Sequence, residues 1–324
     1  MKKIVLALFL NVSLLMSTEA IFGEFGTPKE EKLVMFSADV GLWYISWEQT
    51  STSSDFLQTS SDALDTAYNI DKAPAAVLEL NFNYDFVSAN AEYFNSDGAS
   101  GLGFDVSLIE LIPFINLELR YVKADFEGEY SYSGFNDTSL NGKAKFESPL
   151  EIIDIIIYPV NKYIGVGYRT YNYEMPQDFY LINNTTGSQV VVGGENGGLS
   201  DMQYKGSFYT IVLDNKKEIN SRRNYNGLVY SAICGMGELT PKNLTYSSLD
   251  VYTTDLDATF YDIQIGYSMK EQSDGGFGYG VGAGYRYNKI DTTANKASNA
   301  DNYSLMTEFN TEFHGPYVDV SISF

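Results

Sequence analysis

The stretch Phe277-Gly-Tyr-Gly-Val-Gly-Ala-Gly-Tyr-Arg-Tyr287 decides the fold class. Its odd-numbered positions are apolar or aromatic, and its even-numbered positions are glycine or arginine. Side chains alternate between the two faces of a β-strand, whereas a helix would scatter this pattern around its whole surface. Residues 261–269 alternate in the same way, and Asp274-Gly-Gly276 predicts a turn between the two segments. Together they predict a β-hairpin.

The same period of two recurs along most of the chain and predicts ten strands. Besides the hairpin, the alternating segments are 34–44, 78–86, 89–95, 104–110, 115–121, 143–158, 164–169 and 318–324. Short turns are expected near 87, 113, 160 and 273, and the other connections are mostly longer and polar, an asymmetry typical of membrane barrels. The sequence therefore predicts an all-β, antiparallel transmembrane β-barrel of about ten strands, with both termini on the periplasmic side.

The interval 176–255 leaves the strand count open. It is long, polar and rich in glycine and asparagine, so we expect it to form a long outer-loop insertion. The alternative is an additional hairpin, roughly 208–213 with 227–236, which would raise the count to twelve.

Both ends of the chain carry patterns of export and assembly. Lys2 and Lys3, the apolar stretch 4–16 and Thr18-Glu-Ala20 predict a signal peptide over residues 1–20, and leave 21–324 for the barrel. No later apolar run reaches the ~20 residues that a transmembrane helix needs. The last strand ends on Phe324, a pattern similar to the C-terminal signature that the barrel-assembly machinery recognises. We therefore expect an outer-membrane location and assign Phe324 as the assembly signal.

Composition limits the partners. The formal net charge is −21, so nucleic acid is an unsuitable partner. The 26 tyrosines suit the membrane interface, because each has an apolar ring and a polar tip. Cys234 is the only cysteine, which excludes an internal disulfide. The expected partners are outer-membrane lipid, lipopolysaccharide and the assembly machinery.

Three blocks resemble a little-characterised family of small outer-membrane β-barrel proteins of Gram-negative bacteria. The blocks are residues 111–121 with 125–128, residues 155–162 with 165–167, and residues 284–287 with 315–318 and the final phenylalanine. They cover about half of the chain after the signal peptide, and nothing in 176–255 matches. The resemblance implies a barrel in the outer membrane; it implies no activity, catalytic residue or substrate.

Candidate catalytic and metal-binding residues are few. His314 is the only histidine, and Ser304 and Glu312 are its nearest possible helpers in sequence. A lone histidine does not supply the separate roles of nucleophile, base and orienting group, so we predict no enzyme. No stretch has the spacing of a metal site, and we expect neither metal nor cofactor.

Two further groups have alternative interpretations. Lys216, Lys217, Arg222 and Arg223 form the one basic cluster, which fits either a solvated turn or a lipopolysaccharide phosphate. The aromatic residues Trp43, Tyr44 and Trp47 fall near the outer end of the first strand and predict part of the interfacial girdle.

Charged residues at the positions between lipid-facing ones predict the contents of the lumen. Their signs alternate over five successive predicted strands: Arg120, Asp154, Arg169, Asp262 and Arg286. Neighbouring strands lie ~4.8 Å apart, so an arginine can reach a carboxylate on the next strand. We hypothesise a ladder of ion pairs in a narrow polar lumen; the alternative is a water-filled interior with solvated charges.

A barrel of this size has little free lumen in comparison with porins of roughly sixteen to eighteen strands. The function expected from the sequence is therefore a structural or surface-interaction barrel. The alternative is a narrow, porin-like channel for small solutes or ions.

Overall fold

The structure is a computed structural model. It describes residues 35–53, 64–84, 87–112, 115–132, 140–159, 163–175, 177–183, 186, 189–191, 202–216, 219, 222, 224–243, 255–273, 276–294 and 308–324. The predicted signal peptide lies outside these residues. No helix in the described part of the chain is long and apolar enough to cross a membrane.

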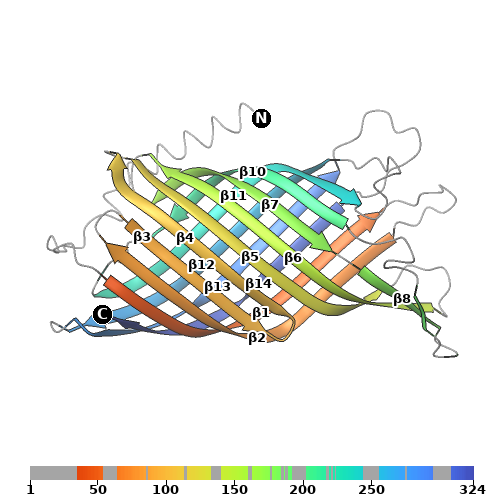
Figure 1. The fold of residues 1–324 in the computed structure, drawn as a ribbon, viewed down its shortest axis with the longest axis horizontal. Coiled ribbons are helices and arrows are strands. Elements are labelled where there is room, and N and C mark those ends of the chain that lie inside the picture. Colours follow the sequence, from red (N-terminus) through yellow and green to blue (C-terminus); the bar gives the residue numbers. More distant parts are fainter. Residues whose placement is uncertain are drawn as a thin grey trace. The chain divides into compact units, whose positions relative to one another are not determined.

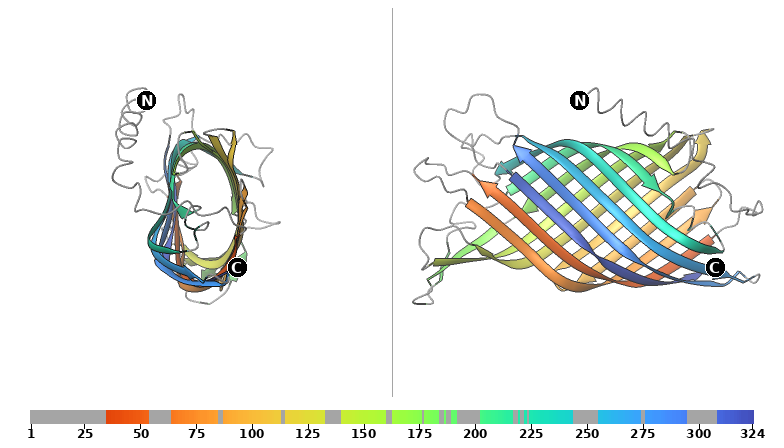
Figure 2. Two further views of the ribbon diagram at one scale, coloured as in Figure 1. Left: turned by 90° about the vertical axis from the view of Figure 1, so that its left-hand side faces the viewer. Right: turned by 180° about the vertical axis from the view of Figure 1, so that it is seen from behind.

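Twelve strands of the described residues form a closed antiparallel ring, seen from the side in Figure 1 and nearly end-on in Figure 2. They are β1 (Met35–Ser53), β2 (Leu64–Tyr84), β3 (Val87–Ser96), β4 (Ala99–Ile112), β5 (Ile115–Tyr132), β6 (Leu140–Tyr158), β7 (Ile164–Met175), β10 (Met202–Asp214), β11 (Tyr225–Asn243), β12 (Leu256–Gln272), β13 (Gly278–Ala294) and β14 (Glu308–Ser323). Each strand pairs with its neighbours in this order, and β14 pairs with β1 to close the ring.

Two short strands extend this wall. β8 (Gln177–Asn183) pairs with the first part of β6, and β9 (Gln189–Val191) pairs with β8. Because the count of barrel strands is even, β1 begins and β14 ends at the same end of the barrel. We call this the terminus end; the last residues of β2, β4, β6, β10 and β12 also lie there, and the opposite end is the loop end.

The expected count of ten strands is wrong, because the barrel contains one additional hairpin. All ten expected strands are present, and β10 and β11 form the additional hairpin that the sequence allowed at 208–213 and 227–236. The interval 176–255 is therefore not one long outer loop, because two of its segments, β10 and β11, are strands of the barrel wall.

Large apolar side chains are exposed on the outer face of all twelve strands. On β1, for example, Val40 is 61 % exposed, whereas Ile45 and Trp47, which face inward, are each 1 % exposed. A closed ring satisfies every ladder hydrogen bond internally, which the hydrocarbon core of a bilayer demands. The apolar exterior and the closed ladder together fit a membrane-spanning wall.

The glycines of the Phe277–Tyr287 stretch face inward and make room for side chains of β14. A Cβ at Gly282 would lie 2.5 Å from Asp319 Oδ1, and one at Gly284 would lie 2.7 Å from Tyr317 Cε1. The Tyr317 hydroxyl reaches across to Gly266 on β12, where a Cβ would also clash with it. The glycine pattern thus lets β14 side chains lie flat against the inner wall.

Candidate functional site

The candidate site is the lumen, and its loop-end part is an aromatic core. Trp47 of β1 stacks on Phe126 of β5, with ring centroids 5.4 Å apart, and on Phe313 of β14 at 5.9 Å. Tyr204 of β10 stacks on Phe309 of β14 at 4.2 Å. The Trp47–Phe126 and Tyr204–Phe309 contacts join strands that are not neighbours in the ring, so these rings pack across the lumen rather than along one wall.

Hydrogen bonds fix this aromatic core in place. The Trp47 indole Nε1 donates to Thr311 Oγ1 at 3.1 Å, and the Tyr173 hydroxyl donates to Gln49 Oε1 at 2.7 Å. The second bond spans the lumen from β7 to β1. Polar atoms that would be costly to bury unpaired are therefore satisfied within the core.

The predicted aromatic girdle is wrong for both tryptophans. Trp43 and Trp47 occupy odd positions of β1 and face the lumen, whereas Tyr44 faces outward and is 46 % exposed. The Trp43 ring lies edge-on to the Phe94 ring. The central carbon of the Arg286 guanidinium lies 5.2 Å from the centroid of the Trp43 ring. Only the tyrosine is in a position to contact lipid.

Arg169 of β7 is the centre of a charged layer beside the aromatic core. Its guanidinium makes a bidentate pair with Asp154 of β6, at 2.6 and 2.8 Å, and a contact of 3.2 Å with Asp262 of β12. It also lies 4.3 Å from the centroid of the Phe260 ring. Arg169 and Asp154 are almost fully buried, so the forked geometry compensates two desolvated charges.

A row of alternating charge follows the wall of four neighbouring strands. Residues directly opposite one another on β4, β5, β6 and β7 are Asp105, Arg120, Asp154 and Arg169. The ion pairs of Arg120 itself are with Glu118, two residues before it, and with Asp214 of β10, whose Oδ2 lies 2.6 Å from Nη2. The predicted ladder does not include Asp105, although its place between the outward-facing Phe104 and Val106 indicates an inward side chain.

Arg286 of β13 pairs with a residue on a strand that is not its neighbour in the ring. Both of its terminal nitrogens lie 2.7 Å from the carboxylate of Glu92 on β3, 194 residues away in the chain. The guanidinium also lies 5.3 Å from the ring centroid of Tyr317. The contact therefore joins two parts of the barrel wall that β14, β1 and β2 separate.

The five residues of the predicted ladder do not all lie on neighbouring strands. Arg120, Asp154 and Arg169 lie on adjacent strands in register, as the ladder requires. Asp262 and Arg286 do not continue the row, because β10 and β11 separate β7 from β12. They reach Arg169 and Glu92 across the lumen instead.

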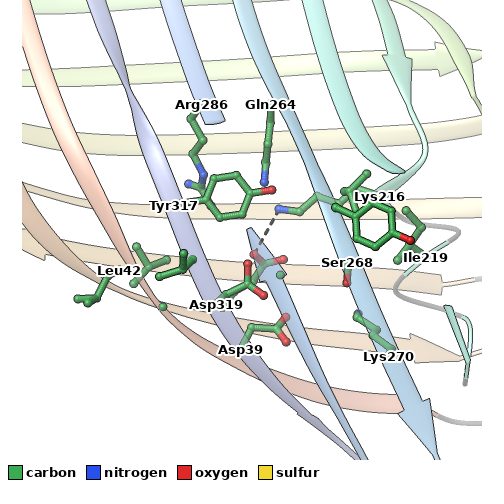
Figure 3. A pocket seen from close by; sticks show the side chains of 17 residues that line it. Asp39, Leu42, Lys216, Ile219, Gln264, Ser268, Lys270, Arg286, Tyr317 and Asp319 are labelled. Atoms are coloured by element: carbon green, nitrogen blue, oxygen red, sulfur yellow. Dashed lines mark hydrogen bonds and ion pairs between the residues drawn. The ribbon is translucent and has the colours of Figure 1, made fainter. Parts of the chain in front are cut away.

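The connection between β10 and β11 turns back into the lumen at the terminus end. Asn215 anchors it, because its backbone N donates to Tyr230 O at 3.0 Å and its side chain accepts from Tyr230 N at 2.8 Å. A helical turn follows, with Ile219 N donating to Asn215 O at 3.1 Å. Ile219 is 2 % exposed, and the Lys216 ammonium reaches Glu79 Oε2 of β2 at 3.2 Å (Figure 3).

Two cavities lie beside Lys216. The first, of about 60 Å³, is bordered by the carboxylates of Asp39, Glu79 and Asp319. The second, of about 120 Å³, has only polar or charged lining residues, including Arg120 and Asp214. The polar lining and the volume of the second cavity suit ordered water or a small polar solute. The terminus-end part of the lumen is thus polar and incompletely filled.

The remaining predicted residues lie outside the lumen or at its end. Of the basic cluster, Lys216 lies at the terminus end and points inward, toward Glu79 rather than lipid phosphate, and Lys217 and Arg223 lie outside the described residues. Phe324 is 59 % exposed; its backbone bonds Phe36 in both directions, at 2.9 and 3.2 Å, and its ring lies edge-on to Phe277.

His314 faces outward on β14, beside Ser46 of β1. Its Nδ1 shares a 2.7 Å hydrogen bond with the Tyr285 hydroxyl, and its Nε2 lies 3.9 Å from Glu312 Oε1. Ser304, the other suggested helper, lies outside the described residues. Within the described residues, no group of three or more acidic, histidine or cysteine side chains could hold a metal ion.

A closed ring with an apolar exterior and a lumen packed with side chains defines the class: this is an outer-membrane β-barrel protein. No protein-family model and no curated protein matches the chain, so the resemblance to a small Gram-negative barrel family stays a prediction.

Solved outer-membrane barrels have a distant likeness to the chain. A Pseudomonas aeruginosa FadL homologue is 11 % identical, with a TM-score of 0.37 over 91 % of this chain and 90 % of its own. The Pseudomonas putida toluene transporter TodX is 8 % identical, with a TM-score of 0.33 over 92 % and 90 %. The Escherichia coli outer-membrane protease OmpT is 9 % identical, with a TM-score of 0.28 over 90 % and 97 %. Such low scores support no conclusion beyond the strand pairing described above.

Proposed function

We propose that this chain is a structural outer-membrane barrel that passes no solute in the conformation described. It holds its loop-end connections at the cell surface, in contact with membrane lipid and lipopolysaccharide, and its terminus end faces the periplasm. The observation behind this proposal is the aromatic core: rings of β1 and β5, and rings of β10 and β14, stack across the lumen at centroid distances of 5.4 and 4.2 Å. Contacts at these distances leave no room for a hydrated ion between the rings.

The proposed role involves no catalysis. His314 is the one candidate base, and its two ring nitrogens contact Tyr285 and Glu312. A general base must share a hydrogen bond with the group that it activates. Neither of these two contacts is with the hydroxyl of Ser46, although that residue lies opposite His314 on β1.

Single-channel recording of the refolded full chain in a planar bilayer tests the closed barrel. We expect no stepwise current from the native chain. Replacing both Phe126 and Phe313 with alanine removes two of the stacked rings, which lie 4.8 Å apart, and should produce current if the aromatic core is the barrier. Phe36→Ala, which removes an outward-facing ring, is the matched control and should stay silent. Stable current from the native chain would overturn the proposal.

The second candidate function is a narrow channel for small solutes or ions. The two cavities beside Lys216 favour it, since they show that the terminus-end part of the lumen is polar and partly empty. Native current with a small unit conductance, unchanged by the double alanine variant, would support this function instead.

A further inference from the structure

The cavity beside Lys216 has a distinctive charge balance. Six charged side chains border it: Asp39, Glu79, Asp319, Lys216, Lys270 and Arg286. Three are carboxylates and three are cations, and one of the cations, Arg286, is already paired with Glu92 outside the lining. Figure 3 shows the Lys216 side chain directed at the carboxylates of this group.

The three cations differ in how firmly they are held. Arg286 lies on β13, and both of its terminal nitrogens are bound to Glu92 at 2.7 Å. Lys270 lies on β12. Lys216 alone comes from a connection between strands, and its contact with Glu79 is one ion pair of 3.2 Å. The lysine side chain is long and flexible, so its rotation can move the ammonium out of the cavity while every strand pair stays formed.

The acceptors in the cavity exceed the donors that the described contacts supply. Asp39 Oδ2 accepts from Asn81 at 2.9 Å, but Asp39 Oδ1 is shielded from solvent and has no hydrogen-bond partner among the described residues. The Glu79 carboxylate accepts from Asn90 at 2.6 Å and from the Lys216 ammonium. A buried carboxylate oxygen without a hydrogen-bond partner is a position at which a further N–H donor would be stabilised.

Because Glu92 balances Arg286, withdrawal of Lys216 would leave three carboxylates of the lining against Lys270. A net negative charge in a confined, partly desolvated cavity is costly, and a cation from solution would reduce it. We propose that this cavity is a binding site for a small primary ammonium ion, and that the Lys216 ammonium occupies it as an internal ligand in the closed barrel. This inference rests on the proposed closed barrel, because an open pore would fill the cavity with electrolyte from both ends.

The test is chemical complementation in the refolded full chain. Lys216→Ala removes the equivalent of an n-propylammonium ion, and we expect it to lower the thermal midpoint of unfolding. Titration with n-propylammonium chloride should return most of the lost midpoint with a saturable dependence. Sodium chloride at equal ionic strength should not, because sodium lacks N–H donors. Native protein should bind n-propylammonium far more weakly, since Lys216 already fills the site.

Two variants provide matched controls. Lys216→Met keeps the volume of the side chain without its charge, and should lose stability that n-propylammonium does not return. Lys216→Ala combined with Glu79→Gln should likewise show no complementation. If Lys216→Ala does not refold unaided, the refolding yield with and without n-propylammonium becomes the measurement, with the same two controls.

Failure of n-propylammonium to complement Lys216→Ala would overturn the inference, as would equal complementation by sodium or in the Glu79→Gln background. The conductance of the native chain is a separate result. Current from native protein would refute the closed barrel, whereas the ammonium titration can fail while the native chain stays silent.

Discussion

Removal of the Arg169 guanidinium should weaken the barrel more than removal of any solvent-exposed charge. In Arg169→Ala, Asp154 loses its bidentate partner while it stays 1 % exposed. Asp262 loses a 3.2 Å contact, but its side chain is 42 % exposed and keeps access to water. The variant therefore leaves one carboxylate that is both charged and buried.

The expected decrease in the free energy of unfolding follows from this difference in burial between Asp154 and Asp262. Breaking a buried pair by removing one partner typically costs about 3–5 kcal/mol. The lost contact with the Phe260 ring adds to this, since a desolvated cation–π contact contributes roughly 0.5–2 kcal/mol. Lys289→Ala is the matched control, because its 3.0 Å pair with Asp291 joins side chains that are 30 % and 42 % exposed. Exposed pairs contribute ~0–1 kcal/mol.

The measurement is the free energy of unfolding of lipid-reconstituted protein in urea or guanidinium chloride, by linear extrapolation. A second variant, Arg169→Met with Asp154→Leu, removes both charges and fills the space with apolar groups. It should recover most of the loss, because well-packed apolar replacements of buried ion pairs are often neutral or stabilising. Equal losses in Arg169→Ala and Lys289→Ala, or a double variant no more stable than Arg169→Ala, would refute the reasoning.

Three further outcomes are expected. Gly282→Ala should destabilise the barrel by about 1–3 kcal/mol, because its Cβ would overpack against Asp319, and calorimetry showing an unchanged midpoint would contradict the role of the glycine row. Phe324→Asp should leave unfolded protein in the periplasm, and a normal heat-modifiable barrel on gels would exclude Phe324 as the assembly signal. Trp43 and Trp47 are the only tryptophans and face the lumen, so brominated lipids should not quench the intrinsic fluorescence; strong quenching would place them in the girdle.

Period-two alternation predicted the fold wherever one face of a strand is polar. The same pattern predicts β10 and β11 only as an alternative, because part of β10 is apolar on both faces. On β10, Phe208 and Val212 face inward into the packed lumen, while Ile211 and Leu213 face outward. Alternation is weak where the lumen itself is a hydrophobic core.

The sequence predicts which residues of the candidate site face the lumen, but it does not predict which of them pair with one another. Residue parity placed Asp154 and Arg169 inside, and strand order made them neighbours. Contacts across the lumen depend on the curvature of the closed ring, which no local pattern encodes. The pair of Arg286 with Glu92 and the inward turn that holds Lys216 therefore became visible only in three dimensions.

The seam between β1 and β14 also governs the order of folding. Ser37 pairs with Ser323, so the contact that closes the ring joins residues from opposite ends of the barrel sequence. Such pairing has a high contact order, and the loop-closure entropy must be overcome before any of its hydrogen bonds can form. Until that step, β1 and β14 each present an unpaired edge that could aggregate in water or stay unsatisfied in lipid. We therefore expect ring closure to be the slowest step of folding and the one most exposed to aggregation.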